Sequence, residues 1–349
     1  MRAARTDKGV SAICQVVSLM MVLEPDGIIA RINANLPSCI RVFGVHRVVK
    51  GFDSRKACDR RRYEYILPAW MFDPAIKTVK VEAEQPENKD DAEEAEAGMN
   101  QKVEYRTIVT EGNPEFEFDG ECVKKLTDIL KQYEGTHNFH NFTVRQPSTS
   151  PQAKRFIIKF SCEGTFTIAG KPWVKLVVIG QSFMLHQIRK MVGMAFAEYK
   201  GIAPPGSLKL AMQARHRIVV PMAPDLGLFL DECYYEAYND RWGNLHGKLS
   251  AEIYREQIQN FKDTQLYPAI ANRDEAEVIN KHWIRSINES YYKFSEWKAV
   301  PPKGVAIQAN KAELGKRKSN DKKKDDTSHK KKNQRSQIIQ AHFSAEYSD

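Results

Sequence analysis

The chain has 349 residues, of which 42% are hydrophobic, and a formal net charge of +9 at pH 7. This size suffices for a large core in one compound domain or two, and the lack of a long apolar run excludes a membrane-spanning helix. Met1 is followed at once by Arg2 and a charged motif, so we expect no signal peptide. The six cysteines are scattered without metal-ligand spacing, which indicates reduced cytosolic or nuclear thiols.

An acidic residue lies between two basic ones near the start of the chain, in the run Arg5-Thr6-Asp7-Lys8-Gly9. The neighbouring cations are expected to keep this carboxylate ionised. An ionised carboxylate in a cleft can act as a nucleophile or a base. On local chemistry alone, an ordinary turn in which Asp7 bonds its own backbone is the commoner explanation. The apolar residues 13–19 that follow predict a strand.

A short helix and two strands are predicted next. Pro25-Asp26-Gly27 opens a helix that carries isoleucines on one side, and Pro37 limits its end. Residues 42–49 and 60–67 then predict strands.

The second of these strands combines aromatic and basic side chains. Tyr63 and Tyr65 are expected on one face, with Arg62 and Glu64 on the other. Aromatic rings beside cations on a strand can stack a base and hold its phosphate. A core tyrosine with exposed charges is the alternative, and it is the more frequent one for this pattern.

The middle of the chain predicts an acidic insertion, a helix and an aromatic loop. Residues 82–98 lack large apolar side chains, so we expect a solvated insertion. Asp119 can cap a helix with a periodic apolar face, and Gly135 follows its end. The loop at 135–143 contains His137 and His140, but no Cys or carboxylate stands at a matching offset, so we expect no metal site there.

A hairpin and a long helix follow. Residues 155–161 and 173–179 predict two strands joined around Gly164 and Gly170, and residues 182–199 predict a helix that stops before Gly201. Arg189 would lie at the edge of the apolar stripe of this helix, and Lys190 would point toward water. An arginine against the core needs an anionic partner, for which Asp7 is a candidate. Extension of the Arg189 side chain into solvent is the alternative.

The chain ends in a basic tail. Residues 311–335 hold eleven Lys or Arg and four Asp or Glu, whereas residues 82–96 hold eight acidic residues and one Lys. The net charges of these two segments cancel, so the rest of the chain keeps a modest excess of basic residues that suits a polyanion partner. The lysine clusters of the tail indicate nuclear import or RNA contact, or a merely soluble tail.

Alternating strands and helices along the chain indicate an α/β sheet protein.

Four segments resemble motifs of the TruA family of tRNA pseudouridine synthases. Residues 4–12 resemble its active-site motif, in the form of the eukaryotic multisite branch. Three further matches are Arg-Arg-Tyr-x-Tyr at 61–65, Gly-Thr-His-x-Phe-x-x-Phe at 135–142, and Ser-Phe-x-x-x-x-x-Arg-x-x-Val-Gly at 182–193. Residues 224–230 resemble the closing strand segment of the family. Together the resemblance spans residues 1–242, apart from the acidic insertion.

The resemblance implies an isomerase that converts uridine to pseudouridine in tRNA without a cofactor or a metal. It assigns Asp7 as the nucleophile, Tyr63 as the residue that stacks on the uracil, and Arg189 as the partner of Asp7. Arg5 would contact the flipped region of the RNA, and Lys8 would be a weaker candidate for a phosphate contact. Arg60, Arg61 and Arg62 would form a basic approach to the cleft, with Arg62 a candidate for substrate binding.

The resemblance also implies an α+β fold of two RNA-binding-like lobes that share a mixed, largely antiparallel sheet around a central cleft. The expected domains are an N-terminal lobe at 1–81, the insertion at 82–98, a second lobe at 99–242, a helical extension at 243–302 and a disordered tail at 303–349. We expect a nuclear monomer, with a mitochondrial form as an alternative. Small nuclear and messenger RNA remain open as further substrates.

One departure from the family pattern affects the expected activity. Family members carry a strand before the Arg-Thr-Asp motif, which here begins four residues after Met1, so we expect this N-terminal strand to be missing. Its loss would expose a sheet edge and part of the core. A catalytically silent RNA-binding protein is therefore the alternative function.

Overall fold

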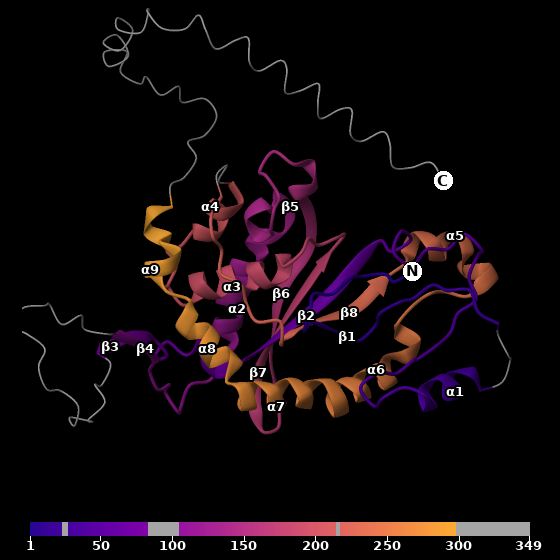
Figure 1. Ribbon diagram of the computed structural model, residues 1–349, viewed down its shortest axis with the longest axis horizontal. Helices are drawn as coiled ribbons and strands as arrows, with labels where there is room; N and C mark the ends of the chain where they lie inside the picture. Colours follow the sequence, from indigo (N-terminus) through magenta and orange to yellow (C-terminus); the bar gives the residue numbers. More distant parts are fainter. Residues whose placement is uncertain (23–26, 83–104, 214–216, 298–349) are drawn as a thin grey trace, which may run out of the picture. The chain divides into compact units, whose positions relative to one another are not determined.

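The computed structural model describes residues 1–22, 27–82, 105–213 and 217–297 (Figure 1). The strands are β1 (Ser11–Ala12), β2 (Arg60–Pro68), β3 (Thr78–Glu82), β4 (Tyr105–Val109), β5 (Gly135–Asn138), β6 (Lys154–Ile168), β7 (Lys171–Gly180) and β8 (Leu228–Tyr234). The α-helices are α1 (Ile28–Ala34), α2 (Gly120–Leu130), α3 (Gln187–Tyr199), α4 (Ser207–Gln213), α5 (Glu236–His246), α6 (Arg255–Phe261), α7 (Tyr267–Glu277), α8 (Ile279–Ser286) and α9 (Glu289–Tyr292). A π-helical turn, η6 (Lys262–Leu266), joins α6 to α7.

Among the described residues, six strands form one mixed sheet in the order β1-β8-β2-β7-β6-β5, and β3 and β4 form a separate two-stranded sheet. The β1–β8 pair is parallel, whereas every other neighbouring pair in the large sheet is antiparallel. The predicted fold class, an α/β protein with a largely antiparallel mixed sheet and helices packed on it, is confirmed. The boundaries of the five predicted domains stay predictions, and the acidic insertion and the basic tail lie outside the described residues apart from Glu82.

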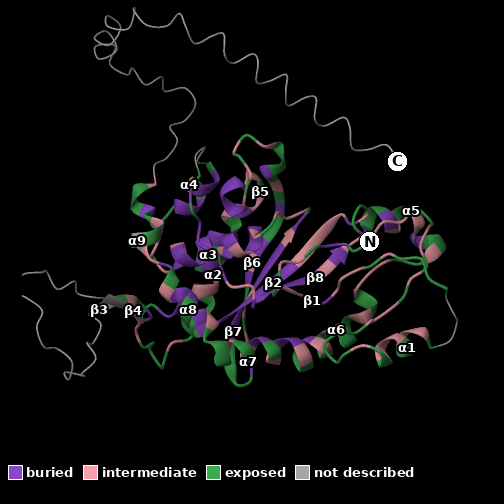
Figure 2. Cartoon of the chain, viewed as in Figure 1, coloured by how far each residue is buried: buried purple, intermediate pink, exposed green. Residues whose placement is uncertain are grey.

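The central strands of the sheet are buried on both faces (Figure 2). On one face, Tyr63, Tyr65 and Val178 join the larger core cluster with residues of α2 and α3. On the opposite face, Ile66, Trp173 and Phe229 pack against Tyr267 and Ile270 of α7. Because neighbouring residues of β2 point to opposite faces, the two cores draw alternately on the same strand.

Four of the predicted elements are confirmed. The strand predicted at 60–67 is β2, and the hairpin strands are β6 and β7. They turn at Ala169 and Gly170, which both have positive φ, and Gly164 instead lies at an irregularity within β6. The predicted helix after Asp119 is α2, and the Asp119 carboxylate accepts a hydrogen bond of 2.9 Å from the Cys122 amide.

Two predicted strands are wrong. Residues 13–19 contain only a bridge between Val17 and Arg2, and the β structure is confined to Ser11–Ala12. Residues 42–49 form no strand, because their side chains pack against the helical extension instead of joining a ladder: Phe43 meets Phe261 edge to face, and the Tyr254 hydroxyl lies 3.0 Å from His46 Nε2. The helix predicted after Gly27 exists as α1, yet none of its residues is buried.

A buried ion cluster links the sheet to the helical extension. Arg62 contacts Glu64 at 2.5 Å and also Asp231, and Lys262 of η6 contacts both of these carboxylates. Burial alone would lower the pKa of Arg62 and Lys262, but the Asp231 and Glu64 carboxylates raise the pKa of both above their ordinary values. The sequence-based placement of Arg62 in the substrate cleft is therefore wrong, because alternation along β2 turns it into this cluster on the opposite face.

Lys190 is also placed differently from its prediction. It is buried rather than directed toward water, and its Nζ donates to the Asn141 carbonyl at 3.2 Å and the Thr143 carbonyl at 3.3 Å. Burial, with a smaller effect of the Arg217 charge, lowers the pKa of Lys190 to about 8. None of the helices in the described ranges is long and apolar enough to cross a membrane.

From the ion cluster we predict that loss of Arg62 destabilises the protein far more than loss of Arg60, which lies outside the cluster. Arg62→Ala leaves two buried carboxylates with one cation and should lower the free energy of unfolding by about 3 to 5 kcal/mol. Arg60→Ala removes an ion pair with Glu236 whose side chains are 30% and 55% exposed, and should cost less than about 1 kcal/mol. Urea titration of both variants measures the difference; equal losses would contradict the structural role of Arg62.

Because burial lowers the pKa of Lys190, we predict that the stability of the protein depends on pH. The folded protein releases the Lys190 proton near pH 8, whereas the unfolded chain holds it up to the ordinary value of 10.5. Between about pH 8 and pH 10.5 the unfolded state therefore binds more protons than the folded state, so the contribution of Lys190 to stability rises with pH. This contribution is lost as the pH falls through 8. The stability of wild type minus that of Lys190→Met should increase from about pH 7 to pH 10. If this stability difference stays constant from pH 7 to pH 10, the prediction is wrong. Lys209→Met, which replaces an exposed lysine, is the control.

Candidate active site

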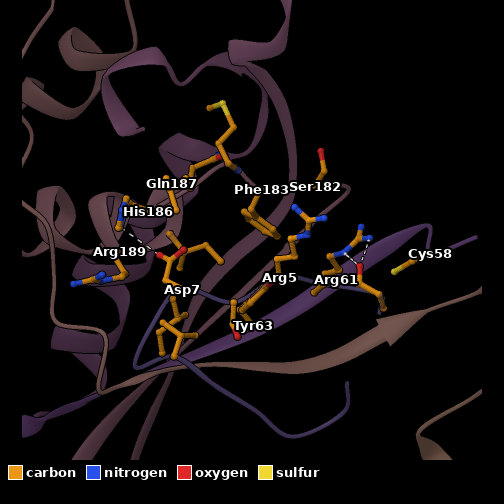
Figure 3. A pocket seen from close by; sticks show the side chains of 18 of the residues that line it. Arg5, Asp7, Cys58, Arg61, Tyr63, Ser182, Phe183, His186, Gln187 and Arg189 are labelled. Atoms are coloured by element: carbon orange, nitrogen blue, oxygen red, sulfur yellow. Dashed lines mark hydrogen bonds and ion pairs between the residues drawn. The ribbon is translucent and has the colours of Figure 1, made fainter. Parts of the chain in front are cut away.

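A cavity of about 780 Å³ lies between the N-terminal loop, the β2 strand and the loop that leads into α3 (Figure 3). Its walls come from residues 3–7 with Val10, from Arg55, Cys58, Arg61 and Tyr63, and from residues 181–189 with Leu228. This volume is in the range of small-molecule and cofactor sites. The cavity gathers four of the six predicted site residues, which come from three segments far apart in the sequence.

Asp7 lies at the wall of the cavity because the chain turns sharply after it. The Val10 amide donates to the Asp7 carbonyl at 3.1 Å, and Gly9 has a φ of 85°, in the left-handed region that favours glycine. A Cβ atom at Gly9 would lie 2.6 Å from Asp225 Cγ, so close approach also requires glycine. The turn leads directly into β1, and the Asp7 side chain remains 16% exposed.

Tyr63 faces the cavity from β2. Its ring meets Phe183 edge to face at a centroid distance of 5.3 Å, and the residue is 6% exposed. Burial raises the pKa of the Tyr63 phenol, so its hydroxyl stays protonated at neutral pH. Tyr65, two residues along, instead donates to the Pro224 carbonyl at 2.8 Å and is part of the core.

The partner of Asp7 differs from the predicted one. His186 Nδ1 lies 3.3 Å from Asp7 Oδ2, whereas no ion pair between Asp7 and Arg189 occurs within the described part of the chain. Arg189 lines the same cavity, but its Nε donates to the Ala223 carbonyl at 2.8 Å. The prediction of a direct Asp7–Arg189 ion pair is therefore wrong, although both residues lie in one cavity.

This difference follows from where α3 begins. The helix was predicted from residue 182, but it starts at Gln187, after His186 with a φ of 62° and a ψ of 3°. Residues 182–186 form a loop that lines the cavity, and this loop brings the imidazole rather than the guanidinium to the carboxylate. The stop of α3 before Gly201 agrees with the prediction.

The remaining candidates for substrate binding are dispersed. Arg5 lines the cavity and is exposed, whereas Lys8 is exposed but is not part of the lining. Arg62 lies on the other face of the sheet, in the ion cluster described above. His137 Nε2 lies 2.7 Å from the Glu134 carbonyl oxygen, and the described residues contain no group of three or more potential metal ligands.

Arg61 is a site residue that the sequence argument placed only loosely. Its guanidinium donates to the carbonyls of Ala3 at 2.8 Å, Gln181 at 3.0 Å and Arg55 at 3.3 Å. These three carbonyls belong to three different walls of the cavity, so the side chain holds the walls together. The alternation that puts Tyr63 toward the cavity also puts Arg61 there, and this was the available signal.

Residues 129–236 match the family model described as tRNA pseudouridine synthase. The chain is 37% identical over 288 residues to the pseudouridylate synthase 1 homolog of Mus musculus, which covers 82% of this chain and 60% of that protein. It is 33% identical over 329 residues to tRNA pseudouridine synthase 1 of Yarrowia lipolytica, covering 80% of this chain and 62% of the relative.

A third relative, tRNA pseudouridine synthase 1 of Saccharomyces cerevisiae, is 35% identical over 287 residues, covering 69% of this chain and 53% of the relative. The chain thus spans a little more than half the length of these curated relatives. The family match covers α3, β8 and part of the cavity wall, and it includes Arg189 but neither Asp7 nor Tyr63. The chain therefore carries a domain of the tRNA pseudouridine synthase family, and the resemblance predicted from its motifs is confirmed.

Proposed function

We propose that the protein isomerises uridine to pseudouridine in tRNA, with Asp7 as the nucleophile. The observation that carries this proposal is the position of the Asp7 carboxylate. It lies, 16% exposed, at the wall of a cavity that also contains the Tyr63 ring from β2 and the basic side chains of Arg5 and Arg189. The similarity to proteins named as pseudouridine synthases, one of them for tRNA, supports the reaction and the tRNA substrate.

The reaction requires only groups that this chain can supply. The bond between ribose C1′ and uracil N1 breaks, the base turns, and a new bond joins C1′ to C5. C5 loses its hydrogen as a proton and N1 gains one, so atoms and electrons balance without a redox partner or water. The Asp7 carboxylate can add either to the base or to the ribose carbon, and both routes return it unchanged at the end.

The cavity residues divide the remaining tasks. The Tyr63 ring would stack on the uracil, and its protonated hydroxyl can donate a hydrogen bond. The exposed Arg5 would contact the RNA backbone next to the flipped nucleotide, and Lys8, outside the cavity lining, would contact a phosphate. Arg189, whose Nε is fixed by the Ala223 carbonyl, would contribute positive charge to the cavity rather than a direct ion pair with Asp7.

A uridine reaches such a cavity only when it leaves its stack. Enzymes that act on a base inside folded nucleic acid pay the cost of unstacking and then hold the flipped nucleotide in a pocket. The basic excess of the chain outside the two charged segments suits this polyanionic substrate. Nuclear residence and a monomeric state remain predictions that rest on the basic tail and on the family resemblance.

Replacement of the nucleophile is the decisive test. Asp7→Asn keeps the shape of the side chain but cannot form the covalent bond, so pseudouridine formation should fall by about a thousandfold or more. Binding of tRNA should change little, because one half-buried carboxylate contributes little attraction for an RNA. Unmodified tRNA transcripts are mixed with protein, pseudouridines are mapped by chemical labelling, and affinity is measured by gel shift.

Asp240→Asn on the exposed surface of α5 is the matched control and should behave as wild type. If the wild-type protein binds tRNA but forms no pseudouridine, the catalytically silent RNA-binding protein replaces this proposal. If Asp7→Asn retains the wild-type rate, another residue is the nucleophile.

A further inference from the structure

His186 is the side chain that faces Asp7 most directly. Its Nδ1 atom is 3.3 Å from Asp7 Oδ2, and the two side chains are 26% and 16% exposed. Nδ1 is itself buried and has no aligned hydrogen-bond partner among the described residues. The imidazole nitrogen is therefore in contact with the carboxylate but is not drawn away from it by another group, unlike Arg189, which is bonded to Ala223.

The backbone at His186 is held in a conformation that few residues adopt. Its φ of 62° and ψ of 3° lie in the left-handed region, which few non-glycine residues adopt and in which Asn, Asp and His are enriched over other side chains. Residues held in this region cluster at functional sites, where the surrounding structure determines them. This conformation ends the cavity loop and turns the ring toward the N-terminal loop (Figure 3).

The surrounding contacts fix the loop on both sides of His186. The Gln187 side chain accepts from the Met184 amide at 2.9 Å, and the Gln187 amide donates to the Met184 carbonyl at 3.1 Å. Before His186, the Thr143 hydroxyl donates to the Leu185 carbonyl at 2.9 Å. The ring thus rests on a rigid loop, which is what an accurately placed polar group requires.

We propose that His186 is a positioning residue for Asp7, in which Nδ1–H holds one carboxylate oxygen so that the other faces the uridine. This inference rests on the proposed function and deepens it. The contact with His186 is made by Oδ2, which leaves Oδ1 as the oxygen that would face the substrate. A nucleophile with one fixed oxygen has fewer unproductive rotamers, and small misplacements of reacting groups cost large factors in rate.

Two substitutions distinguish the effect of the His186 ring nitrogen from the effect of the left-handed backbone at position 186. Asn and Gly both accept the left-handed conformation, so neither adds strain at position 186. The Asn amide nitrogen is attached to Cγ as the imidazole Nδ1 is, so His186→Asn can restore the donor, whereas His186→Gly cannot. His282→Asn on the exposed surface of α8 is the matched control.

Single-turnover rate constants and tRNA affinities are measured for all three variants in the full chain. His186→Gly should lower the rate constant about tenfold or more while the tRNA dissociation constant stays within about twofold, and His186→Asn should recover most of the rate. Equal rates for Asn and Gly would overturn the proposal, as would a loss confined to tRNA affinity or to melting temperature.

A second measurement does not depend on activity. The ring ¹⁵N signals of His186 in histidine-labelled protein should move when Asp7→Asn removes the neighbouring charge, while those of His282 stay in place. Unchanged His186 signals would overturn the contact itself. If wild type forms no pseudouridine but the signals move, the proposed function fails while the Asp7–His186 contact stands, so the two failures are distinguishable.

Discussion

Leu230 of β8 pairs with Ala12 of β1 on one side and with Tyr63 of β2 on the other. This double pairing puts the end of the Asp7 loop in register with the tyrosine that faces the cavity. The β1 strand has only two residues, so the ladder alone is a weak anchor. Further bonds support it: the Ile13 amide donates to Leu230, and the Gln15 side chain bonds both backbone groups of Ala4 at 3.0 Å. The relative position of the Asp7 carboxylate and the Tyr63 ring therefore depends on β8.

Because side chains alternate along β2, its charged residues lie on two different faces and make different contacts. Arg61 and Tyr63 face the cavity, while Arg62 and Glu64 face the ion cluster with Asp231 and Lys262. A period of two can be recognised in a sequence, but it does not reveal which face binds a substrate when both faces carry arginine. The deciding information is in β8 and η6, far along the chain, because their carboxylate and ammonium groups complete the cluster only in the folded protein.

Elements with strong local signals could be predicted from the sequence, and those defined by distant partners could not. The Asp119 cap of α2 and the place of Gly170 in the β6–β7 turn follow from local chemistry, whereas the positive φ of Ala169 does not. Residues 42–49 have strand composition, yet no strand within the described ranges pairs with them, and β propensity by itself cannot supply a partner. The late start of α3 was missed because the apolar period continues into residues 182–186, where contacts from the loop at 139–143 prevail.

That loop shows how the site depends on buried polar groups. A loop packed inside the protein leaves carbonyl groups without ladder partners, and buried carbonyls need donors. Here two cations supply them: Lys190 bonds the Asn141 and Thr143 carbonyls, and Arg217 bonds the His140 and Thr143 carbonyls. Thr143 in turn bonds Leu185, next to the residue that contacts Asp7. The aromatic motif at 135–142 therefore contributes to the site without lining it. It belongs to the segment that holds the loop carrying His186 in place.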